Sequence, residues 1–201
     1  VRAEKKLRVV LPIALFAIWL ILYFQFKRIS TTLLVFSGIL FAWSGGFILI
    51  WLYGQPWFLD ISLFGHNIRE LFQMGTINLS VAVWVGFLAL FGIATDNGVI
   101  VCTYLQQIFT EKNPKTLSEI RAATVEAGDR RVRPAMMTSA TTILALLPVL
   151  TSVGRGSDIM VPMAIPSFGG MLLAILTIFV VPVLYCGLAE ISIFLSRVFR
   201  K

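Results

Sequence analysis

An acidic side chain stands inside a membrane-length apolar run of this sequence. The run GFLALFGIATDNGVIVCTYL covers residues 86–105, and Asp96 lies near its middle. An ionised carboxylate at such depth costs about 3 kcal/mol on insertion scales, so it faces a polar interior or takes up a proton. Removal from water favours the neutral carboxyl, which allows the group to load and release protons. Asp96 is therefore a candidate for a proton or ion relay. The alternative is a structural acid that hydrogen-bonds to a neighbouring helix.

Small residues accompany Asp96 on its predicted helix. Ala82, Ala89 and Gly92 share one side with Asp96 at helical spacing. Small side chains let membrane helices approach closely. The pattern predicts that this side packs against neighbouring helices and that Asp96 faces inward.

A second apolar run supplies hydroxyl groups. Its first half contains Thr138, Ser139, Thr141 and Thr142. Most such hydroxyls bond to carbonyls of their own helix, although one that faces Asp96 can stabilise either form of the acid. No Lys or Arg lies within a predicted span, so we expect the counter-charge to come from outside this chain.

Two methionines form a weaker pattern. Met160 follows the residues RGSD at the start of the last apolar run, and Met163 lies three residues later on the same helical side. Thioethers select soft ions such as Cu(I) and, by the same reasoning, Ag(I). Methionine in an apolar segment also serves simply to fill space, and the spacing leaves both interpretations open.

The composition restricts the class of protein that carries these residues. Of the 201 residues, 58% are hydrophobic and 13% are charged, and the mean hydropathy is +0.88. These values indicate a multi-spanning membrane protein rather than a soluble domain. The net charge of +7 lies in basic clusters between apolar runs, which is typical of cytoplasmic loops rather than of nucleic-acid binding. Cys102 and Cys186 stand alone in apolar segments, so we expect no disulfide framework.

Five runs have the roughly 20 apolar residues that a membrane helix needs, so the sequence predicts an all-α membrane protein with five transmembrane helices. Residues 1–54 hold the first two spans, 78–110 the third, and 134–201 the last two with a basic tail. Between them, residues 55–77 predict an amphipathic helix at the outer interface, or else a docking surface for a partner. Residues 111–133 predict a short surface helix that starts at the capping box TLSE and ends near Gly128.

The distribution of Lys and Arg predicts the orientation. An external N-terminus leaves 11 of the 17 basic residues on the cytoplasmic side and 6 outside. Because cytoplasmic loops carry the excess of Lys and Arg, we expect a periplasmic N-terminus and a cytoplasmic C-terminus.

Three longer motifs carry a family resemblance. The segments SVAVWVGFLALFGIATDNGVIVCTYL, RRVRPAMMTSATTILALLPVL and GRGSDIMVPMAIPSFGGMLLAILTIFVVPVLY together resemble the last five helices of a resistance–nodulation–division transporter. They are most similar to its heavy-metal efflux branch, the copper/silver and cobalt/zinc/cadmium exporters. The likeness covers about residues 5 to 190, and the segment 55–75 is longer than the connection expected in that family.

The resemblance implies a transporter rather than an enzyme. Family members have twelve helices, work as homotrimers in the bacterial inner membrane, and join a periplasmic adaptor and an outer-membrane channel. Proton influx drives export, so protons are the coupling ions and no cofactor is expected. The resemblance gives Asp96 and Thr138 a role in the proton relay and Met160 a role in passing the metal. Ala135 departs from the lysine that some copper/silver exporters carry after RVRP, so a relay that needs that cation is in doubt.

The sequence leaves other functions open. Zinc, cobalt, nickel and cadmium are alternative cargoes. An exporter of hydrophobic compounds on the same scaffold is a second possibility, although Asp96 and Met160 argue against it. A non-transporting membrane subunit or remnant is a third.

Overall fold

The computed structural model describes residues 2–63, 66–114 and 116–198. Its helices and strands are α1 (Arg2–Phe26), α2 (Ile29–Tyr53), β1 (Ser62–Leu63), β2 (His66–Asn67), α3 (Ile68–Leu71), α4 (Val81–Lys112), α5 (Leu117–Leu150) and α6 (Ser157–Val198). Five of these helices, α1, α2, α4, α5 and α6, are long and apolar enough to cross a membrane. The predicted all-α membrane fold with five spans is confirmed for the described residues, apart from the two-residue antiparallel pair β1–β2.

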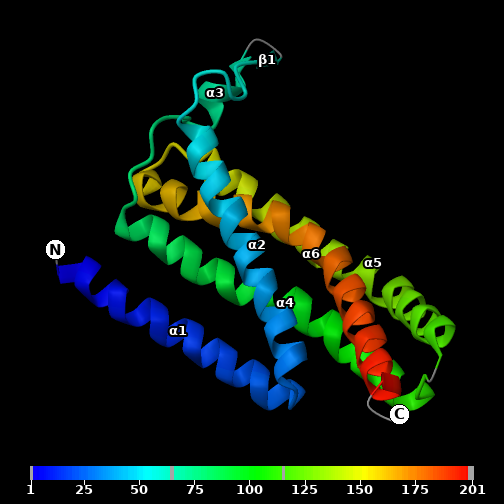
Figure 1. Cartoon of the computed structure of the whole chain (residues 1–201). Coiled ribbons are helices and arrows are strands. Elements are labelled where there is room, and N and C mark those ends of the chain that lie inside the picture. Colours follow the sequence, from blue (N-terminus) through cyan, green and yellow to red (C-terminus); the bar gives the residue numbers. More distant parts are fainter. Residues whose placement is uncertain (1, 64–65, 115, 199–201) are drawn as a thin grey trace.

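Helix α6 lies at the centre of the bundle, where it packs against α2, α4 and α5 (Figure 1). Helices α4 and α6 run parallel, since the Ser167 hydroxyl donates to the Gly86 carbonyl at 3.0 Å and the rings of Phe109 and Tyr185 meet further along. Helix α1 lies at the edge (Figure 1), and among its side chains whose burial is described only Leu22 and Phe26, near its C-terminal end, are buried.

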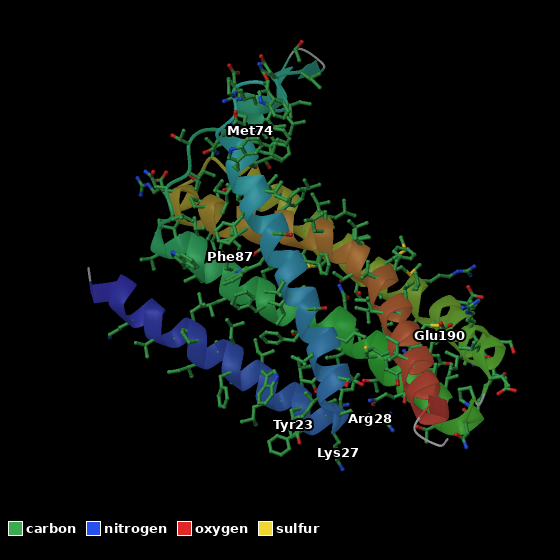
Figure 2. The ribbon with its side chains drawn as sticks, viewed as in Figure 1. Tyr23, Lys27, Arg28, Met74, Phe87 and Glu190 are labelled. Carbon is green, nitrogen blue, oxygen red and sulfur yellow. The ribbon has the colours of Figure 1, made fainter. Side chains whose placement is uncertain are left out.

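Glycines allow the central helices to touch. A Cβ atom added to Gly45 would lie 2.5 Å from the Gly169 carbonyl oxygen, and one added to Gly86 would lie 2.1 Å from the Met163 carbonyl oxygen. Such backbone approach is typical of membrane helices with small residues at their interfaces. Phe87, labelled in Figure 2, is fully buried where α2 meets α4 and contacts the ring of Phe47 at a centroid distance of 4.6 Å.

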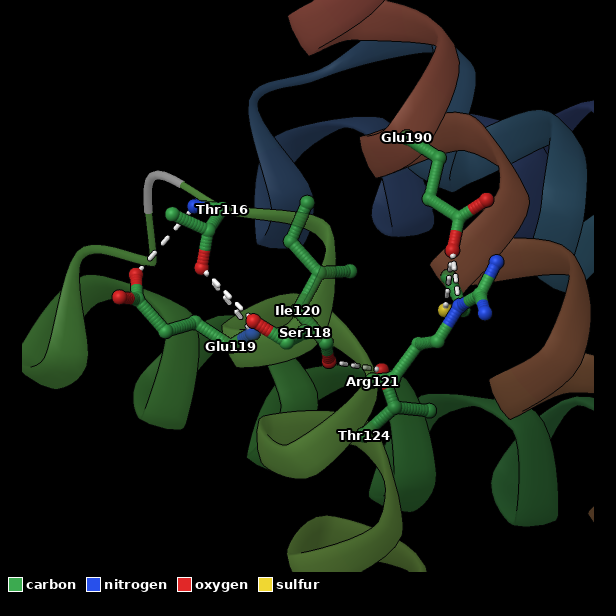
Figure 3. Close-up of polar contacts among 8 residues, drawn as sticks. Thr116, Ser118, Glu119, Ile120, Arg121, Thr124 and Glu190 are labelled. Atoms are coloured by element: carbon green, nitrogen blue, oxygen red, sulfur yellow. Dashed lines mark hydrogen bonds and ion pairs between the residues drawn. The ribbon is translucent and has the colours of Figure 1, made fainter.

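The connection between α4 and α5 differs from its prediction. The predicted capping box is present, since the Thr116 hydroxyl accepts from the Glu119 amide and the Glu119 carboxylate accepts from the Thr116 amide (Figure 3). The predicted end near Gly128 is wrong, because α5 continues through Gly128 and Pro134 to Leu150. At about 1.5 Å per residue its 34 residues extend for about 51 Å, which exceeds the roughly 30 Å of a bilayer's hydrocarbon.

Contacts along the N-terminal half of α5 explain why the helix does not stop. Its residues Ile120, Ala123 and Ala127 are buried against the other helices. The Arg121 guanidinium pairs with the Glu190 carboxylate of α6 at 2.8 Å (Figure 3). This tertiary packing overrides the weak local tendency of a glycine to end a helix.

The predicted amphipathic helix over residues 55–75 is also wrong. The segment instead forms the short pair β1–β2 and the single turn α3, and we refer to residues 55–75 as the cap. The Asn67 side chain explains the break, because it donates to Asp60 and accepts from the Arg69 amide. Phe58, Phe72 and Met74 pack the cap onto the ends of α2, α5 and α6 (Figure 2 labels Met74).

Candidate functional site

Asp96 lies on the side of α4 that the other described helices leave uncovered. Exposed residues of α4 that lie three, four or seven positions apart form one stripe: Val85, Ala89, Gly92, Asp96, Thr103 and Gln107. Among the described residues, none forms a hydrogen bond or an ion pair with Asp96. A Cβ atom added to Gly92 would meet nothing within 4 Å. Helices of this chain therefore do not supply the packing that the sequence predicts around Asp96.

The neighbouring residue Asn97 occupies the buried side instead. Its amide nitrogen Nδ2 donates to the Ser139 hydroxyl of α5 at 3.0 Å, and only 4% and 1% of the two residues are exposed. Ser139 donates in turn to the Ala135 carbonyl. This interhelical bond fixes how α4 and α5 are rotated against each other.

The same bond brings Asp96 and Thr138 to one side of the helix pair. Helices α4 and α5 are antiparallel, because Lys112 pairs with Glu126 whereas Asn97, earlier on α4, pairs with Ser139, later on α5. In two antiparallel right-handed helices, the residues that precede a contacting pair turn toward the same face. Since each residue rises about 1.5 Å, Asp96 and Thr138 also lie within about 3 Å of the same height.

The Thr hydroxyls on α5 donate hydrogen bonds to backbone carbonyls of their own helix. Thr138 Oγ1 donates to the Ala135 carbonyl at 2.9 Å, and Thr142 Oγ1 donates to the Thr138 carbonyl at 2.8 Å. Thr141 behaves in the same way. The common pattern for such hydroxyls is thus observed here, and Thr138 has no direct bond to Asp96.

The sequence analysis missed a cation on this side. Arg131 precedes Thr138 by seven residues, or about two helical turns, so it lies on the same side of α5. Its guanidinium carbon lies 4.6 Å from the centre of the Tyr104 ring on α4, a cation–π distance. Because no described cation forms an ion pair with Asp96, the expectation that a counter-charge comes from outside this chain stays a prediction. The seven-residue spacing between Arg131 and Thr138 could have indicated that both lie on one side of a helix. That inference holds only if the helix continues through Pro134.

Met160 lies far from Asp96. It occupies the first turn of α6 and is 52% exposed, while Met163 is 36% exposed. Because Met163 is level with Gly86 of the parallel helix α4, Met160 and Asp96 are separated by about 20 Å along the bundle. Within the described residues, no group of three or more His, Cys, Asp and Glu side chains could hold a metal ion. The structure thus separates the candidate metal residue from the candidate proton site.

Known proteins are similar to this chain in sequence and in the arrangement of its helices. A profile of the AcrB/AcrD/AcrF family matches residues 71–189, which include α4, α5 and most of α6. The chain belongs to this family. It also aligns with cation efflux system protein CusA of Escherichia coli K12, with 35% identity over 191 residues, and with cobalt-zinc-cadmium resistance protein CzcA of Cupriavidus metallidurans, with 31% identity over 184 residues.

A solved structure agrees with these relatives. The crystal structure of a heavy metal efflux pump superposes on 94% of this chain with a TM-score of 0.71 and 28% identity. The chain is thus a multi-pass membrane protein of the heavy-metal efflux branch of the resistance–nodulation–division transporters. The alignments cover 92% and 91% of this chain, but it spans only 16% of CusA, 15% of CzcA and 16% of the solved pump.

Proposed function

We propose that this chain forms part of the membrane domain of a proton-driven exporter of heavy-metal cations, with Cu(I) and Ag(I) as the favoured cargo. One observation carries the proposal: Asp96 is held on the uncovered side of α4, level with Thr138, by the buried bond between Asn97 and Ser139. A lone acid at this depth is costly, and the cost is acceptable where the acid must gain and lose a proton.

The residues of this side have complementary roles in the proposal. Asp96 binds the proton and becomes neutral, then releases it and becomes negative. The Thr138 hydroxyl, free to rotate, can exchange one of its helix carbonyl partners for the carboxylate. Arg131 adds a positive charge to the Thr138 side of α5, about two helical turns from Thr138, where it contacts the Tyr104 ring. Met160 acts separately as a soft ligand on the path of the metal.

The uncovered side requires a partner in the membrane. We propose that the missing cover is the other half of a twelve-helix transporter, which lies outside this chain. The proposed assembly is a homotrimer in the bacterial inner membrane, surrounded by lipid and joined to a periplasmic adaptor and an outer-membrane channel. The N-terminus and the cap lie on the periplasmic side, and the loop between α4 and α5 lies in the cytoplasm. No resident cofactor is required.

Other cargoes fit the same scaffold. The names of the relatives CzcA, CnrA and NccA refer to cobalt, zinc, cadmium or nickel, and divalent ions are the second candidate. The exposed thioethers of Met160 and Met163 favour a soft monovalent ion over these. Export of hydrophobic compounds and a role limited to assembly are further alternatives.

Transport by the intact protein in liposomes tests the proposal. An imposed proton gradient should drive Cu(I) or Ag(I) across the membrane, and collapse of the gradient by a protonophore should stop it. Equal transport with and without the gradient would exclude proton coupling. Transport of zinc or cobalt without transport of silver would show that divalent ions, rather than Cu(I) or Ag(I), are the cargo.

A further inference from the structure

A groove opens beside the last two turns of α2. One wall consists of Phe47 and Trp51 of α2 with Gly54 and Gln55, which follow the helix. The opposite wall is the segment before α4, with Thr76 and Leu79. The groove holds about 450 Å³, which lies within the range of roughly 300–1,000 Å³ for small-molecule sites. It lies apart from the stripe that carries Asp96.

The walls of the groove match the hydrocarbon edge of a membrane. Phe47 and Trp51 belong to a helix that is long and apolar enough to span a bilayer, and polar side chains occur only at the cap end, at Gln55 and Thr76. Trp51 and the nearby Trp57 are 59% and 64% exposed. Tryptophan prefers the boundary between hydrocarbon and headgroups, so the groove extends from that boundary into the hydrocarbon.

Arg69 of the cap is bonded to Gln55, which lines the polar end of the groove. Its Nη1 donates to the carbonyls of Gln55 at 2.7 Å and Pro56 at 3.0 Å, which fixes the guanidinium beside the groove. A guanidinium has five N–H donors. Among the described residues, the donors on Nε and Nη2 have no hydrogen-bond partner, and no acid forms an ion pair with Arg69.

We propose that this groove is a phospholipid-binding site, in which an acyl chain lies between α2 and the segment before α4 and the phosphate binds the free donors of Arg69. The guanidinium geometry suits phosphate oxygens. A neutral amphiphile would leave those donors unused. The proposal is independent of the cargo and of proton coupling.

Native mass spectrometry of the intact transporter in detergent tests the site. The probes are dioleoyl phosphatidylethanolamine and dioleoylglycerol, which share their acyl chains but differ in the phosphate. We expect the phospholipid to be retained about tenfold more strongly, since a hydrogen bond to a charged group has that effect. Arg69→Gln should remove this preference, and Arg155→Gln, which changes an exposed arginine outside the groove, should preserve it.

A second variant tests the groove itself. A Cβ atom at Gly54 would lie 3.4 Å from the Trp51 carbonyl oxygen and 4.0 Å from Thr76 Cγ2, so Gly54→Leu fits the backbone and fills the groove. It should reduce retention of both lipids, whereas Gly154→Leu, in open space, should not. Equal retention of both lipids by wild type, or phospholipid retention that neither Arg69→Gln nor Gly54→Leu reduces, would overturn the proposal.

Discussion

Asn97 of α4 and Ser139 of α5 form a buried hydrogen bond of 3.0 Å between the two helices that carry Asp96 and Thr138. Each partner immediately follows one of the two candidate relay residues. Because the helices are antiparallel, the bond turns Asp96 and Thr138 to the same uncovered side. A polar pair inside the bundle therefore determines the position of the acid at its surface.

Replacement of Asp96 by Asn should abolish metal resistance and proton-driven transport, because the amide keeps the size of the side chain but cannot take up the proton. Expression and assembly of the protein should remain normal. Metal resistance of cells and transport in liposomes are the measurements. Asp129→Asn is the matched control, since Asp129 is an exposed acid on α5 with no assigned role. Wild-type resistance of the Asp96→Asn protein would exclude the relay.

Loss of the Ser139 hydroxyl should weaken both stability and transport. Ser139→Ala leaves the buried amide of Asn97 without its partner. Interhelical bonds in membranes contribute about 0.6 kcal/mol on average and up to about 1.7 kcal/mol, so a double-mutant cycle with Asn97→Leu should give a coupling in this range. Transport should fall severalfold as Asp96 loses its fixed orientation.

Two variants separate this effect from a general loss of a hydroxyl. Ser139→Thr retains the donor and acceptor and should restore most transport. Ser44→Ala removes an exposed hydroxyl that donates to the Phe41 carbonyl of its own helix and should change little. If Ser139→Ala lowered the unfolding temperature but left transport unchanged at every pH, the bond would be purely structural.

The sequence predicted the spans well because apolar length is a local property. The sequence-based prediction failed where contacts between distant residues decide how far a helix extends and how it is rotated. Gly128 and Pro134 are residues that commonly end a helix. Buried residues of α5 and the ion pair Arg121–Glu190 nevertheless stabilise a continuous helix across them. Periodicity correctly grouped Gly92 with Asp96, but the rotation of α4 follows from Asn97–Ser139, which no local pattern reveals.

Substitution of Gly86 by Ala should destabilise the bundle. The added Cβ would lie 2.1 Å from the Met163 carbonyl oxygen and 2.7 Å from Pro166 Cγ, so α4 and α6 must move apart. Overpacking of this kind typically costs about 1–3 kcal/mol. Gly128→Ala is the control, because its Cβ meets nothing within 4 Å, and it should stabilise α5 by about 0.5–1 kcal/mol. Thermal unfolding in detergent gives both values, and equal unfolding temperatures would contradict the packing.

Replacement of Met160 by Leu should make cells more sensitive to copper and silver but not to zinc or cobalt. Leucine preserves the apolar volume but removes the thioether that a soft ion needs. Met137→Leu is the control, since Met137 is exposed on α5 and distant in sequence from Met160. Unchanged tolerance to both soft metals would remove Met160 from the ion path.

Replacement of Arg131 by Gln should lower transport severalfold and change its pH dependence. The positive charge on the Asp96 side of the helix pair is lost, together with the contact to the Tyr104 ring. Arg131→Lys keeps the charge but not the planar stacking on the Tyr104 ring. Compared with Arg131→Gln, it should therefore restore the pH dependence of transport more fully than the stability of the protein. Arg130→Gln is the matched control, because Arg130 is exposed and, within the described part of the chain, pairs with Glu126 alone, at 3.5 Å. Such an exposed pair is worth at most about 1 kcal/mol. Identical pH profiles for wild type and Arg131→Gln would show that the cation acts in packing alone.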